Sequence, residues 1–164
     1  MEDPENLLVK TGFPQRHLLS AVKETRAKAE AGDGDAMWLL GDWYQLGMNG
    51  LAVDEAQARA WYERSAAARD PRGLAYFAEC LLCGIGGPKD NVLGLVNVTE
   101  AAHLGSNMGA CTLGEVFFKG LCGLPKDPAR ARYWLKKVVD GECAHKHLLS
   151  ADIAKAAAML RELD

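Results

Sequence analysis

The stretch Gly84-Ile-Gly-Gly-Pro-Lys-Asp90 could bind a phosphate, because a glycine-rich loop can turn several backbone amides toward one anion. A phosphate loop of the P-loop type also needs a preceding strand, a following helix and a Gly-Lys-Ser/Thr ending. Here Pro88 separates the glycines from Lys89, and no Ser or Thr follows. The loop also recurs at 47–54 and 120–127, each time between stretches with helical apolar spacing. Since a cofactor site is normally single, we interpret the three loops as connections from helix to helix.

The stretch Cys143-Ala-His145-Lys-His147 is a candidate metal site, because it places three potential zinc ligands close together. Either Cys111 or Cys122 could in principle be a fourth ligand. Structural zinc sites prefer paired ligands at C-x-x-C or H-x-x-x-H spacing, and this stretch has neither. We therefore expect a solvated turn here and no metal.

A redox site is the third candidate, because Cys80 and Cys83 have C-x-x-C spacing. They fall inside a helical stretch without the strand-to-helix context of a redox motif, so we expect buried thiols. The five cysteines are odd in number and do not follow the repeat described below. This arrangement predicts free thiols and not a disulfide scaffold. No Ser or Cys has a recognisable catalytic partner pattern, so we expect no enzyme and no cofactor.

Composition limits the remaining classes of function. The chain has 164 residues, of which 49% are hydrophobic and 25% charged, as in an ordinary soluble domain or one short array. A formal net charge of −3 and scattered Lys and Arg predict no binding to nucleic acid. The acidic start MEDPENLLVK precedes no apolar run of signal-peptide or bilayer length. We expect a cytoplasmic protein that does not bind membranes, although a chain trimmed of a signal peptide would look similar.

Comparing the sequence with itself shows a repeat longer than the loops. The junctions between its units lie 37, 36 and 36 residues apart, at Gly32, Arg69, Gly105 and Gly141. A period of this length predicts a solenoid of helix pairs. Glycine suits a junction because a helix commonly ends with a left-handed residue. Each helix pair has an apolar stripe that it cannot bury alone, so it is stable only when stacked on the next.

The registered copies resemble the Sel-one-like repeat, a relative of the tetratricopeptide repeat with the pattern A-x-x-x-L-G-x-x-Y-x-x-G, a loop, D, A-x-x-W-Y and A-A-x-x-G. The resemblance covers about residues 27 to 143, and the middle copy departs from it at Gly73, Ala78, Leu81 and Asn97. It implies an all-α, right-handed superhelix of antiparallel helix pairs and a function in protein–protein interaction. The positions that match the pattern structurally are Gly41, Tyr44, Gly47, Trp61, Gly84, Gly114, Phe117, Gly120 and Trp134.

We expect a single solenoid domain, 1–164, with about three repeats, capping helices at both ends, about nine helices in all, one of them very short, and no strands. The final helix should begin at Ser150 and cover the last unit with Ile153, Ala156, Ala157 and Leu160. The expected segments are a tail at 1–14, a half-repeat at 15–32, repeats at 33–69, 70–105 and 106–141, and a cap at 142–164.

In repeats of this kind the first helix of each pair lines the concave face. There, an acidic residue follows the small packing residue in every copy, as Asp42, Glu79 and Glu115. Repetition at one position favours a groove that complements a basic segment of a protein or peptide, although a solvated helix face would show the same pattern. The candidate groove residues are Trp38, Asp42, Gln45, Glu79, Leu82, Glu115 and Phe118.

These features together favour a non-catalytic adaptor that holds a protein or peptide in its concave groove. One alternative is a cognate inhibitor of a bacterial toxin, which the small acidic chain would suit. Another is a small hydrolase similar to the cysteine-rich repeat proteins linked to β-lactam binding, whose regular cysteines staple each helix pair. The irregular cysteines of this chain weigh against the hydrolase.

Overall fold

A computed structural model describes residues 16–145 and 150–163. Over this part the chain forms eight helices and no strand, which confirms the all-α class; the expected number of helices can be compared only here. The helices are α2 (Arg16–Glu30), α3 (Gly34–Leu46), α4 (Glu55–Ala67), α5 (Pro71–Cys83), α6 (Asn91–His103), α7 (Asn107–Lys119), α8 (Pro128–Val139) and α9 (Ser150–Glu162).

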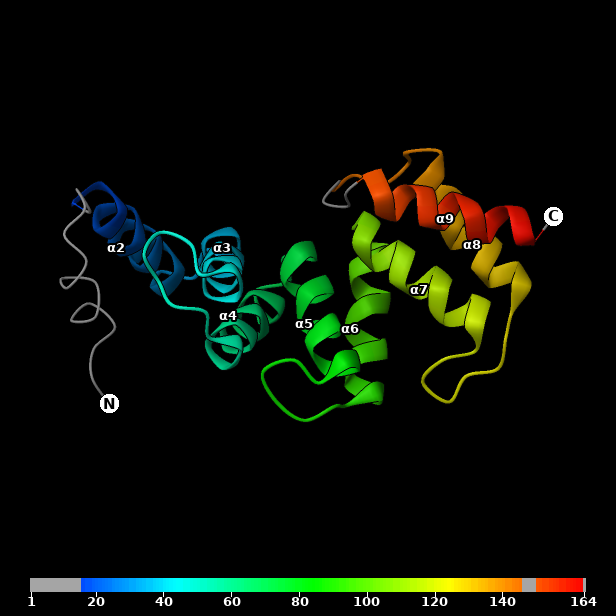
Figure 1. Cartoon of the computed structure of the whole chain (residues 1–164), viewed down its shortest axis with the longest axis horizontal. Helices are drawn as coiled ribbons and strands as arrows, with labels where there is room; N and C mark the ends of the chain where they lie inside the picture. Colours follow the sequence, from blue (N-terminus) through cyan, green and yellow to red (C-terminus); the bar gives the residue numbers. More distant parts are fainter. Residues whose placement is uncertain (1–15, 146–149, 164) are drawn as a thin grey trace.

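The helices pack as a solenoid of three antiparallel pairs, α3/α4, α5/α6 and α7/α8 (Figure 1). Between the pairs, α4 packs on α5 and α6 packs on α7, while α2 covers α3 at one end and α9 covers α7 and α8 at the other. The apolar stripe of each pair is therefore buried by its neighbours, as stacking requires.

The array has an inner and an outer side. The first helices contact one another, α3 with α5 and α5 with α7, whereas no comparable contact joins α4 to α6 or α6 to α8. Because the first helices lie closer together than the second ones, α3, α5 and α7 form the inner side of the curve. We call their surface the inner face, and the surface of α4, α6 and α8 the outer face.

The three glycine-rich loops are helix connections, as their recurrence predicts. Each first helix ends in a left-handed glycine, Gly47, Gly84 or Gly120, with φ of 67°, 78° and 69°. Each second helix begins after an aspartate whose carboxylate accepts a backbone N–H at 2.9 Å. The glycines of Gly84-Ile-Gly-Gly thus serve to turn the chain between two helices. The capping aspartates are Asp54, Asp90 and Asp127.

The large residues at repeat positions lie in the core. Tyr44, Trp61, Phe117 and Trp134 are all buried. The small packing residues allow the two helices of a pair to approach closely, and a Cβ atom added at Gly41 would lie only 2.5 Å from the Tyr62 ring. On α9, Ala156 is fully buried and Ile153 and Leu160 pack on the last unit, but Met159 also joins the core.

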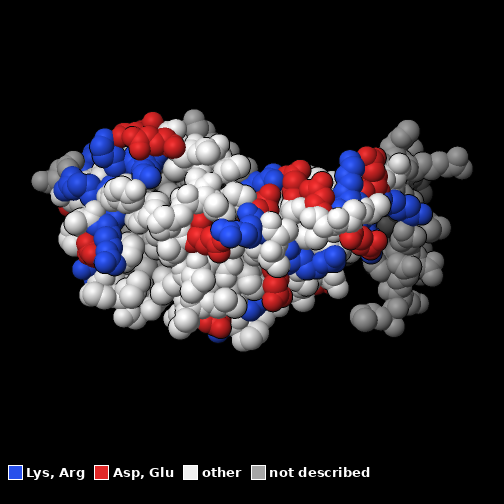
Figure 2. All heavy atoms as spheres, turned by 180° about the vertical axis from the view of Figure 1, so that it is seen from behind, with Lys and Arg blue, Asp and Glu red and all other residues white. Residues whose placement is uncertain are grey.

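On the face shown in Figure 2, Lys and Arg side chains lie among Asp and Glu side chains, with uncharged surface between them. No continuous basic patch appears on this face. Among the described residues, every helix is too short or too polar to cross a bilayer.

Candidate partner-binding face

All seven candidate groove residues lie on α3, α5 or α7, and each is partly exposed. Two of them contact the second helix of their own pair, and a third packs on the core. Gln45 accepts a hydrogen bond of 2.6 Å from the Tyr62 hydroxyl on α4, and Leu82 lies against Gly94 of α6. Phe118 packs on the core of units two and three. The contacts of Gln45 and Leu82 orient these two side chains toward the second helices.

Glu115 is neutralised within the chain. Lys155 of α9 donates hydrogen bonds of 3.1 and 3.0 Å to its two carboxylate oxygens, and Lys119 donates one of 2.5 Å. Burial alone would raise the pKa of Glu115, but the hydrogen bonds from Lys119 and Lys155 hold it below its ordinary value. This acid therefore belongs to the contact between α7 and α9, which reduces the predicted row to Asp42 and Glu79.

Asp42 and Glu79 differ from Glu115 because neither has an ion pair or a side-chain hydrogen bond with any described residue. Burial raises the pKa of Asp42. Burial, and then the charge of Asp152 on α9, raise the pKa of Glu79. Asp70, another half-buried acid, is bonded to Arg72 at 2.9 Å and has a lowered pKa despite its burial. The two inner-face acids are thus half-buried charges without a counterion in the part of the chain that the structure describes.

Aromatic rings lie beside these two acids. The rings of Tyr62 and Tyr76 stack with centroids 5.1 Å apart, and Trp38 lies 6.1 Å from Tyr76. Burial raises the pKa of both tyrosines, and the charges of Asp42 and Glu79 raise it further, so both phenols stay protonated. We call the group Trp38, Asp42, Tyr76 and Glu79 the acidic–aromatic site. Sequence comparison missed Tyr76 because the other copies have leucine and threonine at its position.

Comparison with known proteins shows that the sequence matches the model of a repeat family. The Sel1 repeat model matches residues 34–70, 72–106 and 108–138. The chain belongs to the Sel1 repeat family. A crystal structure of a Sel1 repeat protein from Oxalobacter formigenes is similar, with a TM-score of 0.68 and 25% sequence identity over 87% of this chain and 98% of that chain.

A second solved structure is a protective antigen of uropathogenic Escherichia coli that displays an SLR fold. It has a TM-score of 0.39 and 20% identity, and the match covers 98% of this chain and 43% of that chain. No curated protein matches the sequence. The expected division of this Sel1 repeat protein into units at 33–69, 70–105 and 106–141 remains a prediction.

The cysteines of the Sel1 repeat protein are all free thiols. Burial raises the pKa of both Cys80 and Cys111 to about 11, which makes them poor nucleophiles near neutral pH. The expectation of a buried thiol is wrong for Cys83, which is exposed because it occupies the last turn of α5, where unit three has the exposed Lys119. The free and irregular cysteines lack the staples of the cysteine-rich hydrolases.

The candidate zinc ligands serve other roles where the structure describes them. Cys143 is buried and points its thiol at the Lys137 carbonyl, 3.7 Å away. His145 pairs through its backbone with Gly105 and Asn107. His147 lies outside the described residues. In the ranges 16–145 and 150–163 no three potential ligands come together.

Replacing Glu79 with Gln should raise the melting temperature by about 1–3 °C near neutral pH, whereas Glu115→Gln should lower it by a similar amount. The pKa of Glu79 in the folded state is raised above its ordinary value of 4.5. The charged form of Glu79 therefore destabilises the fold at pH values above about 4.5. The lowered pKa of Glu115 means the opposite, and its contribution is lost only as the pH falls through that lowered value. Thermal melts across pH should therefore show that the Glu79→Gln gain vanishes below about pH 4.5, whereas the Glu115→Gln loss shrinks progressively as the pH falls from about 4.5 to the lowered pKa. Equal signs for the two variants would contradict this assignment.

Proposed function

We propose that this Sel1 repeat protein is a non-catalytic adaptor whose inner face, at α3 and α5, binds a basic segment of a partner protein. The observation that carries the proposal is that Asp42 and Glu79 are half-buried without a counterion among the described residues, whereas Glu115 at the same repeat position is paired. Unpaired half-buried charges cost stability, so they are expected where a partner supplies the missing charge. Family membership supports a role in protein interaction.

The aromatic members of the site supply the contact area that charges alone lack. Tyr and Trp side chains are enriched among residues that dominate binding energy, and a cation can stack on their rings. The chain itself shows this contact, because the guanidinium carbon of Arg72 lies 4.4 Å from the centre of the Trp38 ring. A lysine or arginine of the partner would meet a carboxylate and a ring together.

Selection of random peptides displayed on phage, with this protein as the immobilised target, tests the proposal. We expect selected peptides to be enriched in Lys and Arg, and the double variant Asp42→Asn/Glu79→Gln to bind them at least about tenfold more weakly. Most of this loss should be slower association that disappears at high salt, as expected for charge steering.

Glu115→Gln is the matched control, since it removes the third acid of the same register and should leave binding within about twofold of the wild type. All three substitutions keep the side-chain shape, so circular dichroism should show unchanged helix content in both variants. Selected peptides without basic residues, or equal losses in both variants, would show that the two acids do not form the binding site.

A further inference from the structure

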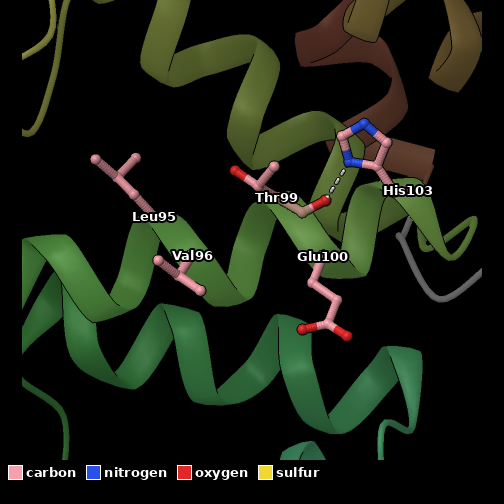
Figure 3. Close-up of a pocket in the computed structure, with 5 residues that line it drawn as sticks. All are labelled: Leu95, Val96, Thr99, Glu100 and His103. Carbon is pink, nitrogen blue, oxygen red and sulfur yellow. Dashed lines mark hydrogen bonds between the residues drawn. The ribbon is translucent and has the colours of Figure 1, made fainter.

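The outer side of α6 carries a stripe of exposed or partly exposed side chains, Val92, Val96, Thr99 and His103, of which the first two are aliphatic. Val92 is 75% exposed and Val96 57% exposed. Together with Leu95, Thr99, Glu100 and His103, Val96 lines a shallow hollow of about 470 Å³. In Figure 3, Leu95, Thr99 and His103 extend from one side of α6, and Val96 and Glu100 extend from the other.

This stripe is not required by the repeat. The side chains that α6 buries against its neighbours lie on its opposite side, at Asn97, Val98, Ala101 and Ala102. In the other two units the same outer positions carry charged side chains, except for the small Ala60 on α4 and the exposed aromatic Tyr133 on α8. Counted from the capping aspartates, Leu95, Val96 and Thr99 correspond to Arg59, Ala60 and Glu63 of α4 and to Arg132, Tyr133 and Lys136 of α8. An apolar patch of this kind on a water-exposed surface commonly marks an interaction site.

We propose that the outer face of α6 binds the same face of a second copy of this chain, with the two helices antiparallel about a two-fold axis. The stripe residues Val92, Val96, Thr99 and His103 are spaced by four, three and four residues, and this order reads the same from either end. An axis between Val96 and Thr99 therefore places Val96 of each copy against Thr99 of the other, and Val92 against His103. Such a self-complementary patch is what a two-fold interface needs.

The two ends of α6 carry groups that suit the antiparallel arrangement. Asp90 caps the start of the helix and is exposed, while His103 lies in its last turn. The antiparallel pair brings the His103 end of one helix beside the Asp90 end of the other, and it sets the two helix dipoles in opposite directions. Beside the stripe, Glu100 already forms a salt bridge of 2.9 Å with Arg69 of its own chain. Dimer formation therefore leaves the Glu100 carboxylate with a counterion.

A two-fold contact at α6 closes the assembly at a dimer. It uses the same patch of both copies and leaves none free to extend a chain of molecules. The contact involves few side chains per copy, so we expect weak association, with a dissociation constant on the order of 10–100 μM. It leaves the inner face open and does not depend on the proposed partner binding.

Sedimentation equilibrium of the full chain over concentrations from about 1 to about 500 μM tests the dimer. We expect the average mass to rise from one chain toward two, without larger species. Val96→Glu places like charges near the axis and should weaken association at least about tenfold. Val92→Lys changes the most exposed position of the stripe and should weaken association similarly. It serves as a second test in case Val96→Glu impairs folding.

Ala60→Glu is the matched control, because Ala60 is exposed on α4 at the position that Val96 occupies on α6. Its association should equal that of the wild type. A mass of one chain at every concentration, or equal weakening by Ala60→Glu, would overturn the proposal. Association that all three variants retain would place the dimer contact elsewhere and would also overturn it.

Discussion

Tyr62→Ala is expected to lower the free energy of unfolding by about 3–5 kcal/mol, as for other large aromatic residues deleted from a core. Tyr62 is fully buried and joins three helices. Its ring lies against Gly41 of α3 and stacks on Tyr76 of α5, and its hydroxyl bonds to Gln45. Alanine would leave a cavity where units one and two meet, because the rigid helix backbones cannot close it. Chemical denaturation monitored by circular dichroism gives the free energy.

Two further variants separate the contributions of Tyr62. Tyr62→Phe keeps the ring and removes the hydrogen bond to Gln45, so its cost should be about 1 kcal/mol. Tyr133→Ala removes an aromatic side chain that is 54% exposed on α8 and should cost less than about 1 kcal/mol. A cost for Tyr62→Ala no larger than that for Tyr133→Ala would show that the first two units do not depend on this ring.

The helix pairs and their connections could be predicted from the sequence because local interactions determine them. Gly120 must end its helix since it adopts a left-handed conformation, and Asp127 must begin the next since its carboxylate caps the first turn. Both residues act within a few positions of the chain, and both recur at the repeat period. Recurrence therefore revealed them without knowledge of the packing.

The candidate site could be predicted only in part, because it depends on contacts between units. The position of Glu115 is the same as that of Asp42 and Glu79, but the pairing with Lys155 spans 40 residues and has no counterpart in the repeat. Tyr76 likewise differs from the residues at its position in the other copies. A repeat pattern shows what the copies share, whereas the site arises from the residues in which they differ.

Gly73 shows how one such departure is required by packing. The middle unit has glycine at the position of Ala36 in unit one, and unit three has Gly109 there, so both depart from the alanine of the repeat pattern. A Cβ atom at Gly73 would lie 2.1 Å from the Ser65 Oγ atom and 2.8 Å from the Ser65 backbone carbonyl carbon on α4. Ser65 cannot turn away freely, because it is fully buried and its hydroxyl donates a hydrogen bond of 2.7 Å to the Gly34 carbonyl. Glycine therefore lets α5 touch the backbone of α4.

Gly73→Ala is accordingly expected to lower the free energy of unfolding by about 2–3 kcal/mol, even though alanine favours helix over glycine by about 1 kcal/mol. Gly94→Ala on α6 is the matched control. There the added Cβ would lie 2.6 Å from Cδ2 and 2.8 Å from Cγ of Leu82. The Leu82 side chain is partly exposed and can shift, whereas the Ser65 backbone cannot, so the change should cost clearly less than Gly73→Ala.

The Gly73 substitution should also divide the unfolding of the array, because α4 and α5 form the contact that joins units one and two. A linear array loses cooperativity when one interface between neighbours is weakened. Hydrogen exchange should then show α2–α4 opening at a lower free energy than α6–α8, whereas in the wild type and in Gly94→Ala the two halves should exchange more nearly together. A single cooperative transition with a loss below about 0.5 kcal/mol would mean that the helices separate slightly at little cost, and that the glycine is not needed for the close contact.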